Sequence, residues 1–84
     1  MSKILIIEDE EAIRRVLLKI LSEANPLYQV FEAVDGLSGA ELIKREDFDL
    51  VLCDIKMPKM DGVEVLEAAK KIKPEIPIVM ISGH

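Results

Sequence analysis

The stretch LVLCD, residues 50–54, decides the fold of this chain. Four apolar residues in a row are typical of a strand that is covered on both faces of a sheet, and this run ends in Asp54. The run ILII at residues 4–7 has the same design and is followed by Glu8 and Asp9. The sequence therefore places three carboxylates directly after two strand-like runs.

A third apolar run, IVMI at residues 78–81, ends in Ser82. If the three runs are parallel strands of one sheet, their carboxyl ends lie at one edge, which is where open α/β sheets bind ligands. Carboxylates that are crowded at such an edge repel one another unless a cation joins them. The pattern therefore predicts a metal site at this edge.

Amphipathic segments separate the apolar runs and predict three helices, and residues 28–33 predict a further strand at an edge of the sheet. Asn25-Pro26 ends the first helix, and Asp35-Gly36 and Asp61-Gly62 open the second and third. Alternating strands and helices indicate an α/β fold with parallel strands and right-handed crossovers. The residues expected to face inward are Ile13, Val16, Leu17, Ile20, Leu21 and Ala24 in the first helix, Leu37, Ala40 and Ile43 in the second, and Val65, Leu66, Ala69 and Ile72 in the third.

The composition limits the class of protein. The chain has 84 residues, which is enough for one small domain, and 50% of them are hydrophobic, which favours a folded chain. A net charge of −5 disfavours binding of nucleic acid or of anionic membranes by this segment. No apolar run is long enough to span a bilayer, and the start shows no signal peptide. With Cys53 as the single cysteine, which excludes an intrachain disulfide, these features favour the cytoplasm.

The acids themselves indicate the chemistry of the site. Three carboxylates with no His or Cys beside them in sequence suit a hard cation, and Mg²⁺ is the natural choice because it needs few carboxylates and keeps waters. Glu8 and Asp9 are adjacent, so we expect them to point in different directions, one to the metal directly and the other through water. Such a site can draw a phosphoryl group onto Asp54, with the Ser82 hydroxyl donating to a phosphoryl oxygen.

Three stretches, ILIIEDE at residues 4–10, DIKMPKMDG at residues 54–62 and ISGH at residues 81–84, resemble the receiver domain of bacterial two-component response regulators. The last stretch is similar to receivers of enhancer-binding activators of the nitrogen-regulation type. The resemblance implies a role for each residue of the site: Asp54 as phosphoacceptor, Asp9 and the backbone carbonyl of Lys56 as Mg²⁺ ligands with Asp54, Glu8 as an outer acid acting through water, and Ser82 as the switch hydroxyl.

The resemblance also implies a flavodoxin-like, doubly wound parallel sheet with strand order 2-1-3-4. A receiver ordinarily continues into a fifth strand that ends in a lysine, and into two more helices. We therefore expect residues 1–84 to be a truncated receiver domain, a fragment of a longer regulator, with phosphorylation and output impaired. We also expect self-association, through the first-helix face or the edge of residues 78–81.

Function follows from the resemblance as a set of expectations. The partners implied are a sensor histidine kinase, which donates the phosphoryl group, and the output domain of the parent protein; this segment is not itself expected to be an enzyme. One alternative is a receiver-like dimerisation module that is not phosphorylated. Another is an aspartate-nucleophile phosphohydrolase, which Lys56 disfavours because such enzymes carry an acid two residues after the nucleophile.

Other residues have simpler interpretations. Asp61 is expected to cap a helix. Met57 and Met60 are expected to pack, and Cys53 to be a buried, inert thiol. The pair at residues 14–15, two arginines, is expected to be either a solvated helix face or the place where a histidine kinase docks.

Overall fold

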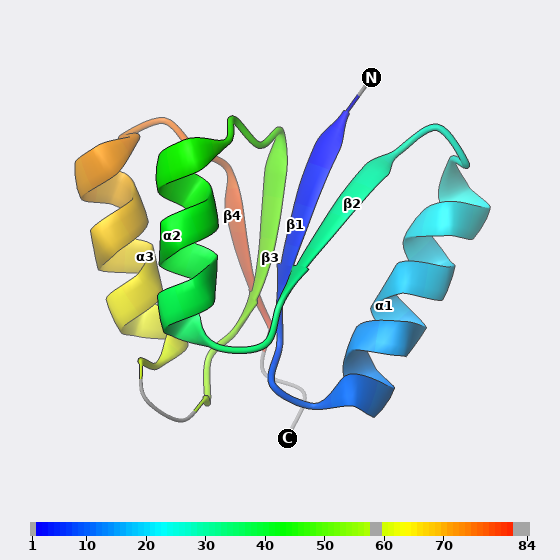
Figure 1. Cartoon of the computed structure of the whole chain (residues 1–84), viewed down its shortest axis with the longest axis horizontal. Helices are drawn as coiled ribbons and strands as arrows, with labels where there is room; N and C mark the ends of the chain where they lie inside the picture. The colour runs from blue at the N-terminus through cyan, green and yellow to red at the C-terminus, as the bar shows by residue number, and fades with distance from the viewer. Residues whose placement is uncertain (1, 58–59, 82–84) are drawn as a thin grey trace.

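A computed structural model of the chain describes residues 2–57 and 60–81. Within these residues four strands alternate with three helices, and no helix is both long and apolar enough to cross a membrane. Figure 1 shows their arrangement. The elements in chain order are β1 (Lys3–Ile7), α1 (Glu11–Ala24), β2 (Gln29–Ala33), α2 (Gly36–Arg45), β3 (Leu50–Asp54), α3 (Gly62–Ile72) and β4 (Ile78–Ile81).

The four strands form one parallel sheet in the order β2-β1-β3-β4. This order confirms the doubly wound arrangement that the alternating pattern predicts, and β2 lies at an edge as expected. β1 is central because it pairs with both β2 and β3, with Ile7 opposite Ala33 on one side and Cys53 on the other. The carboxyl ends of β1 and β3 therefore lie next to each other, which positions the residues that follow them.

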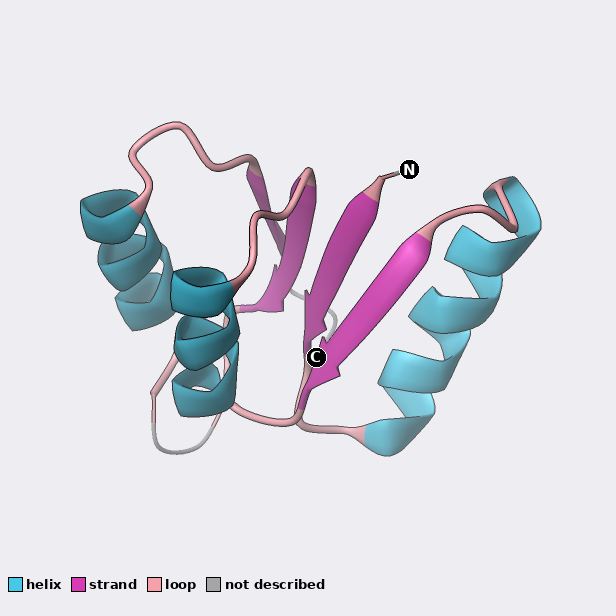
Figure 2. Ribbon diagram, turned by 45° about the horizontal axis from the view of Figure 1, so that its top comes forward, coloured by secondary structure: helices cyan, strands magenta, loops and turns pink. Residues whose placement is uncertain are grey.

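Helices cover both faces of the sheet, with α2 and α3 side by side on one face and α1 on the other (Figures 1 and 2). Side chains alternate along each strand, so Leu5 and Ile7 of β1 join the core with α2 and α3 while Ile4 and Ile6 face the side of α1, and all four are buried. The buried core beneath α2 and α3 comprises Leu5, Ile7, Ala33, Ile43, Phe48, Val51, Cys53, Val65, Ala69 and Ile76.

Aspartates begin both helices on that face. The carboxylate of Asp35 accepts a hydrogen bond from the N–H of Ser38 at 2.8 Å, and that of Asp61 accepts one from the N–H of Glu64 at 3.0 Å. Each satisfies a backbone donor that the first helical turn leaves unpaired. The capping role predicted for Asp61 is thereby confirmed.

The predicted inward face of α1 is wrong in part. Val16 and Ile20 are 57% and 58% exposed, and no residue of α1 is fully buried. Ala24 is exposed as well, whereas Ile13, Leu17 and Leu21 are partly buried, in line with the prediction. Among the described residues nothing covers the apolar side that Val16 and Ile20 form. Periodicity alone cannot tell which part of a wide apolar stripe meets the sheet.

The predictions for α2 and α3 fail at one residue each. Leu37 is 56% exposed, because α2 turns Gly36, Gly39 and Ile43 inward; at Gly39 a Cβ would lie only 2.8 Å from the Cγ1 of Ile7. The part of α2 that lies closest to the sheet thus consists of glycines, which a search for hydrophobic periodicity does not count as core residues. In the last turn of α3, Ile72 is 37% exposed.

Gly62 fixes how closely α3 approaches the end of β3. Its N–H donates to the carbonyl of Ile55 at 2.8 Å. A Cβ at this position would collide with the carbonyl oxygen of Asp54 and lie 2.7 Å from the Cα of Ile55. Since both neighbours are backbone atoms, a side chain here requires the helix or the strand end to move.

We expect Gly62→Ala to lower the free energy of unfolding by about 1–3 kcal/mol, the usual cost of overpacking a rigid site. Urea unfolding followed by circular dichroism measures this. Val63→Ala is the matched control, because Val63 is 52% exposed in the same helical turn and its truncation should change stability little. Equal midpoints for Gly62→Ala and the wild type would contradict the close packing of α3 on this strand end.

Candidate functional site

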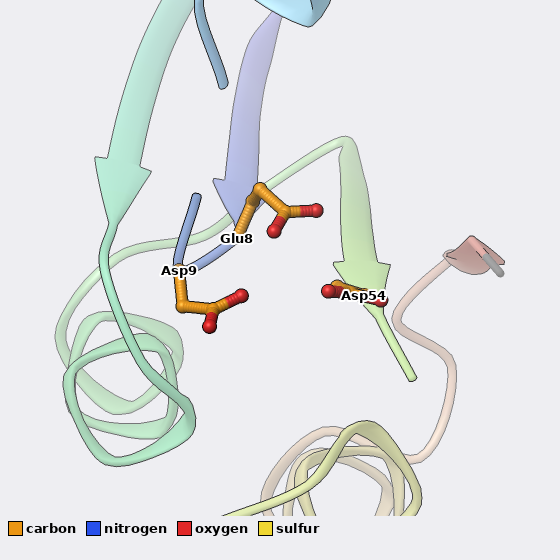
Figure 3. A group of neighbouring side chains, drawn as sticks. All are labelled: Glu8, Asp9 and Asp54. Carbon is orange, nitrogen blue, oxygen red and sulfur yellow. The ribbon is translucent and has the colours of Figure 1, made fainter. Parts of the chain in front are cut away.

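The ends of β1 and β3 bring Glu8, Asp9 and Asp54 together. One carboxylate oxygen of each lies within 4.8 Å of the other two. Figure 3 shows Glu8 and Asp9 leaving the end of β1 and Asp54 at the end of β3, with their carboxylates turned toward one another. The juxtaposition follows from the pairing of β1 with β3, in which Ile7 lies opposite Cys53.

Glu8 and Asp9 both face this site, so the expectation that adjacent acids point in different directions is wrong. The expectation assumed that strand pleating continues through both residues. β1 ends at Ile7, and although the N–H of Glu8 still donates to the carbonyl of Ala33 at 3.1 Å, the chain then bends at Asp9. Outside a strand the two-residue alternation no longer applies, so both carboxylates can converge.

Glu8 is almost fully buried, as Asp54 is. Its side chain is 2% exposed, and Oε2 accepts a hydrogen bond from the N–H of Glu10 at 3.1 Å. The pKa of the Glu8 carboxyl is raised to about 7, mainly by burial; the Glu10 N–H lowers it, and the neighbouring Asp9 and Asp54 raise it. The group therefore holds a proton up to near-neutral pH in the metal-free chain, which relieves part of the repulsion in the cluster.

Asp54 occupies the position that the sequence predicts for the central acid. It is 1% exposed, and its Oδ1 accepts a hydrogen bond from the N–H of Lys56 at 3.2 Å. The Lys56 side chain is exposed. This hydrogen bond orients one carboxylate oxygen of Asp54 toward the loop after β3, while the assignment of the Lys56 carbonyl as a metal ligand stays a prediction.

Asp9 carries the clearest sign that the cluster is built for a cation. Its Oδ1 is buried and has no hydrogen-bond partner, and it is the only such side-chain atom within residues 2–57 and 60–81. A buried carboxylate oxygen without a partner is unfavourable unless something positive completes it. The three carboxylates supply hard oxygen ligands. Asp9 as a residue is more exposed than Glu8 and Asp54, which leaves room for water, so the donor set fits Mg²⁺.

Arg14 contacts this site, so the solvated helix face, one of the two interpretations of residues 14–15, is wrong for Arg14. The other interpretation, a place where a histidine kinase docks, stays a prediction. The side chain of Arg14 is only 14% exposed, whereas that of Arg15 is 77% exposed. Nη1 of Arg14 donates to the carbonyl of Glu8 at 2.9 Å and to that of Asp9 at 3.3 Å. Its partners at the site are backbone carbonyls, so the sequence carries no signal for this role.

The remaining expectations have mixed outcomes. Cys53 is buried, and burial raises the pKa of its thiol to about 12, so the inert thiol is confirmed. Met57 and Met60 pack against the core, as expected. Ser82 lies outside the described residues, so its role stays a prediction.

A family model described as the response regulator receiver domain matches residues 4–84. Among curated proteins, the chain is 41% identical over 83 residues to the response regulator receiver protein CpdR of Brucella abortus. That alignment covers 99% of this chain and 68% of the Brucella protein.

Solved structures give the same result. The receiver domain protein of Methanospirillum hungatei, described as CheY-like, matches with a TM-score of 0.91 and 37% identity, over 100% of this chain and 66% of that one. A chain in the complex of the histidine kinase ThkA with the response regulator protein TrrA matches with a TM-score of 0.90 and 31% identity, over 99% of this chain and 70% of its own length. The chain thus spans about two thirds of the proteins it matches.

The raised pKa of Glu8 predicts a specific pH dependence of stability. In the metal-free chain the folded state holds a proton on Glu8 up to about pH 7, whereas the unfolded chain releases it near the ordinary pKa of 4.5. The contribution of Glu8 to stability is therefore fully present below pH 4.5 and is lost as the pH rises toward 7.

The side chain of the Glu8→Gln variant cannot ionise. As the pH rises from 4.5 to about 7, its free energy of unfolding should therefore increase relative to that of the wild type, by on the order of 3 kcal/mol at most. Urea unfolding of both proteins in the presence of a chelator, at a series of pH values, measures the difference. A difference that does not change with pH would show that Glu8 titrates normally in the folded chain.

Proposed function

Because this chain belongs to the family of response regulator receiver domains, we propose that it acts as a phosphoacceptor, with Asp54 as the residue that receives the phosphoryl group. Residues 1–84 would act as one receiver unit. The observation that carries the proposal is the convergence of Asp54 with Glu8 and Asp9, where Asp9 Oδ1 is buried and has no partner.

The proposed reaction is a phosphoryl transfer to a carboxylate. An oxygen of Asp54 attacks the phosphorus of a phosphohistidine, a P–O bond forms, the P–N bond breaks, and the electron pair returns to the imidazole. The product is an aspartyl phosphate. Asp54 suits this role because it ends β3 and its Oδ1 is oriented by the N–H of Lys56 at 3.2 Å.

Asp9, Asp54 and the backbone carbonyl of Lys56 would hold Mg²⁺, and Glu8 would act as the outer acid. When bound, the ion supplies positive charge that offsets the negative charge of the phosphoryl oxygens. The chain itself contributes the orientation of Asp54 and a partly dehydrated acidic site, in which Glu8 is 2% exposed. Ser82 would donate its hydroxyl to a phosphoryl oxygen and so report phosphorylation to the rest of the protein.

The partner proposed for this reaction is a sensor histidine kinase in the cytoplasm. The support is the similarity to a chain in the complex of a histidine kinase with a response regulator protein. An output domain of the parent protein would then read the phosphorylated surface, because a new charge at a strand end can bias a two-state element. The net charge of −5 speaks against direct binding of nucleic acid by this segment.

A second candidate function is association without phosphorylation. It is favoured by the exposed apolar side chains Val16 and Ile20 on α1 and by Val79 on β4, which is 50% exposed at the sheet edge. Sedimentation velocity at high micromolar concentration tests it, and a monomer there would contradict it. A phosphohydrolase is the weakest alternative, because the position two residues after Asp54 holds the exposed lysine Lys56 and not an acid.

We expect the wild-type chain to incorporate a phosphoryl group from acetyl phosphate in the presence of Mg²⁺, and Asp54→Asn to incorporate none. Intact-mass spectrometry measures the adduct. Asp9→Asn should show strongly reduced incorporation, because it removes a carboxylate from the proposed metal site. Asp61→Asn is the matched control: it removes the same charge near the site, and Asn caps helices as well as Asp.

Two results would contradict the proposal. One is equal incorporation by the wild type and Asp54→Asn. The other is incorporation by the wild type that does not depend on Mg²⁺.

A further inference from the structure

Arg14 is the one basic side chain, within the described residues, that is hydrogen-bonded to the backbone of the acidic site. It lies in the first turns of α1 and is 14% exposed. Its Nη1 donates to the carbonyl oxygens of both Glu8 and Asp9, at 2.9 and 3.3 Å, and its Nε donates to Oε1 of Glu32 on β2 at 3.3 Å. One guanidinium thus links α1, the end of β1 and β2.

These contacts bear on where the two carboxylates point. A peptide unit is planar, so fixing a carbonyl oxygen fixes the orientation of the whole unit and, with its neighbour, the direction of the Cα–Cβ bond between them. Arg14 holds the carbonyls that follow the Cα atoms of Glu8 and Asp9, while the N–H of Glu8 is held by the carbonyl of Ala33 at 3.1 Å. Both ends of the acidic turn are therefore fixed by other elements.

We infer that Arg14 is a positioning residue for the proposed metal site: it orients the turn at Glu8 and Asp9 so that both carboxylates converge on Asp54. The inference rests on the proposed function, since it concerns the same site. The planar guanidinium suits this task, because its donors lie in a fixed fork and reach two carbonyls and a carboxylate together, which an ammonium cannot do.

The sign of the effect distinguishes positioning from plain charge. A cation beside a metal site repels Mg²⁺, so on charge alone the loss of Arg14 should strengthen Mg²⁺ binding. If Arg14 positions the ligands, its loss should weaken Mg²⁺ binding despite the removed positive charge. Loss of an outer residue that orients metal ligands typically weakens metal affinity by about 10–100-fold.

Isothermal titration of the full 84-residue chain with MgCl₂ at constant ionic strength tests the inference, at a temperature where circular dichroism shows every variant to be folded. We expect Arg14→Ala to bind Mg²⁺ at least about tenfold more weakly than the wild type. Arg14→Lys should also bind more weakly, because it keeps the charge and loses the fork. Arg15→Ala should bind as the wild type does, since Arg15 is 77% exposed and, within residues 2–57 and 60–81, pairs with Glu11 of the same helix alone.

The outcomes separate this inference from the proposed function. Equal or tighter Mg²⁺ binding by Arg14→Ala, with a wild type that binds, would overturn the positioning role and leave the proposed function standing. A wild type that binds no Mg²⁺ would overturn both. A lower thermal stability of Arg14→Ala without weaker Mg²⁺ binding would assign Arg14 a purely structural role and likewise overturn the inference.

Discussion

The repulsion among three carboxylates at one sheet edge is the constraint on which the rest of this structure depends. Glu8, Asp9 and Asp54 have oxygens within 4.8 Å of one another, and two of these side chains are almost fully buried. Burial weakens the screening by water, so like charges repel more strongly there than at an open surface. A metal-free chain must tolerate this arrangement, and the surrounding elements show how it does so.

Two features let the metal-free chain hold the three carboxylates close together: rigid neighbouring elements, and a proton on Glu8. The pairing of β1 with both β2 and β3 fixes the two strand ends, and Gly62 lets α3 approach the backbone of Asp54. Because the pKa of Glu8 is raised to about 7, the Glu8 carboxyl is partly protonated near neutral pH, and the cluster carries less negative charge. Binding sites commonly retain such local destabilisation, because the same groups that oppose folding favour the ligand.

Much of this could be predicted from the sequence. Apolar runs that end in acids predict parallel strands with a shared edge, and the observed order β2-β1-β3-β4 confirms it. Asp54, Asp9 and Glu8 are signalled in the same way, since parallel strands place their carboxyl ends together.

The failures have two physical causes. Periodicity reports how wide an apolar stripe is and not which part of it meets the sheet, so it predicts Val16 and Ile20 in the core although both are more than half exposed. The alternation of side chains in a regular strand does not extend past the end of the strand, so it cannot predict that Glu8 and Asp9 converge. The place of Arg14 at the site cannot be predicted for a related reason: its partners are backbone carbonyls, which no sequence pattern displays.

The most direct test of the account is the urea midpoint of the wild type and of Asp9→Asn, each measured with a chelator and with Mg²⁺ at matched ionic strength. The account predicts that without metal Asp9→Asn is the more stable protein, because one repelling charge is gone, and that Mg²⁺ stabilises the wild type far more than the variant. A variant that is less stable than the wild type without metal, or that gains as much from Mg²⁺, would contradict it.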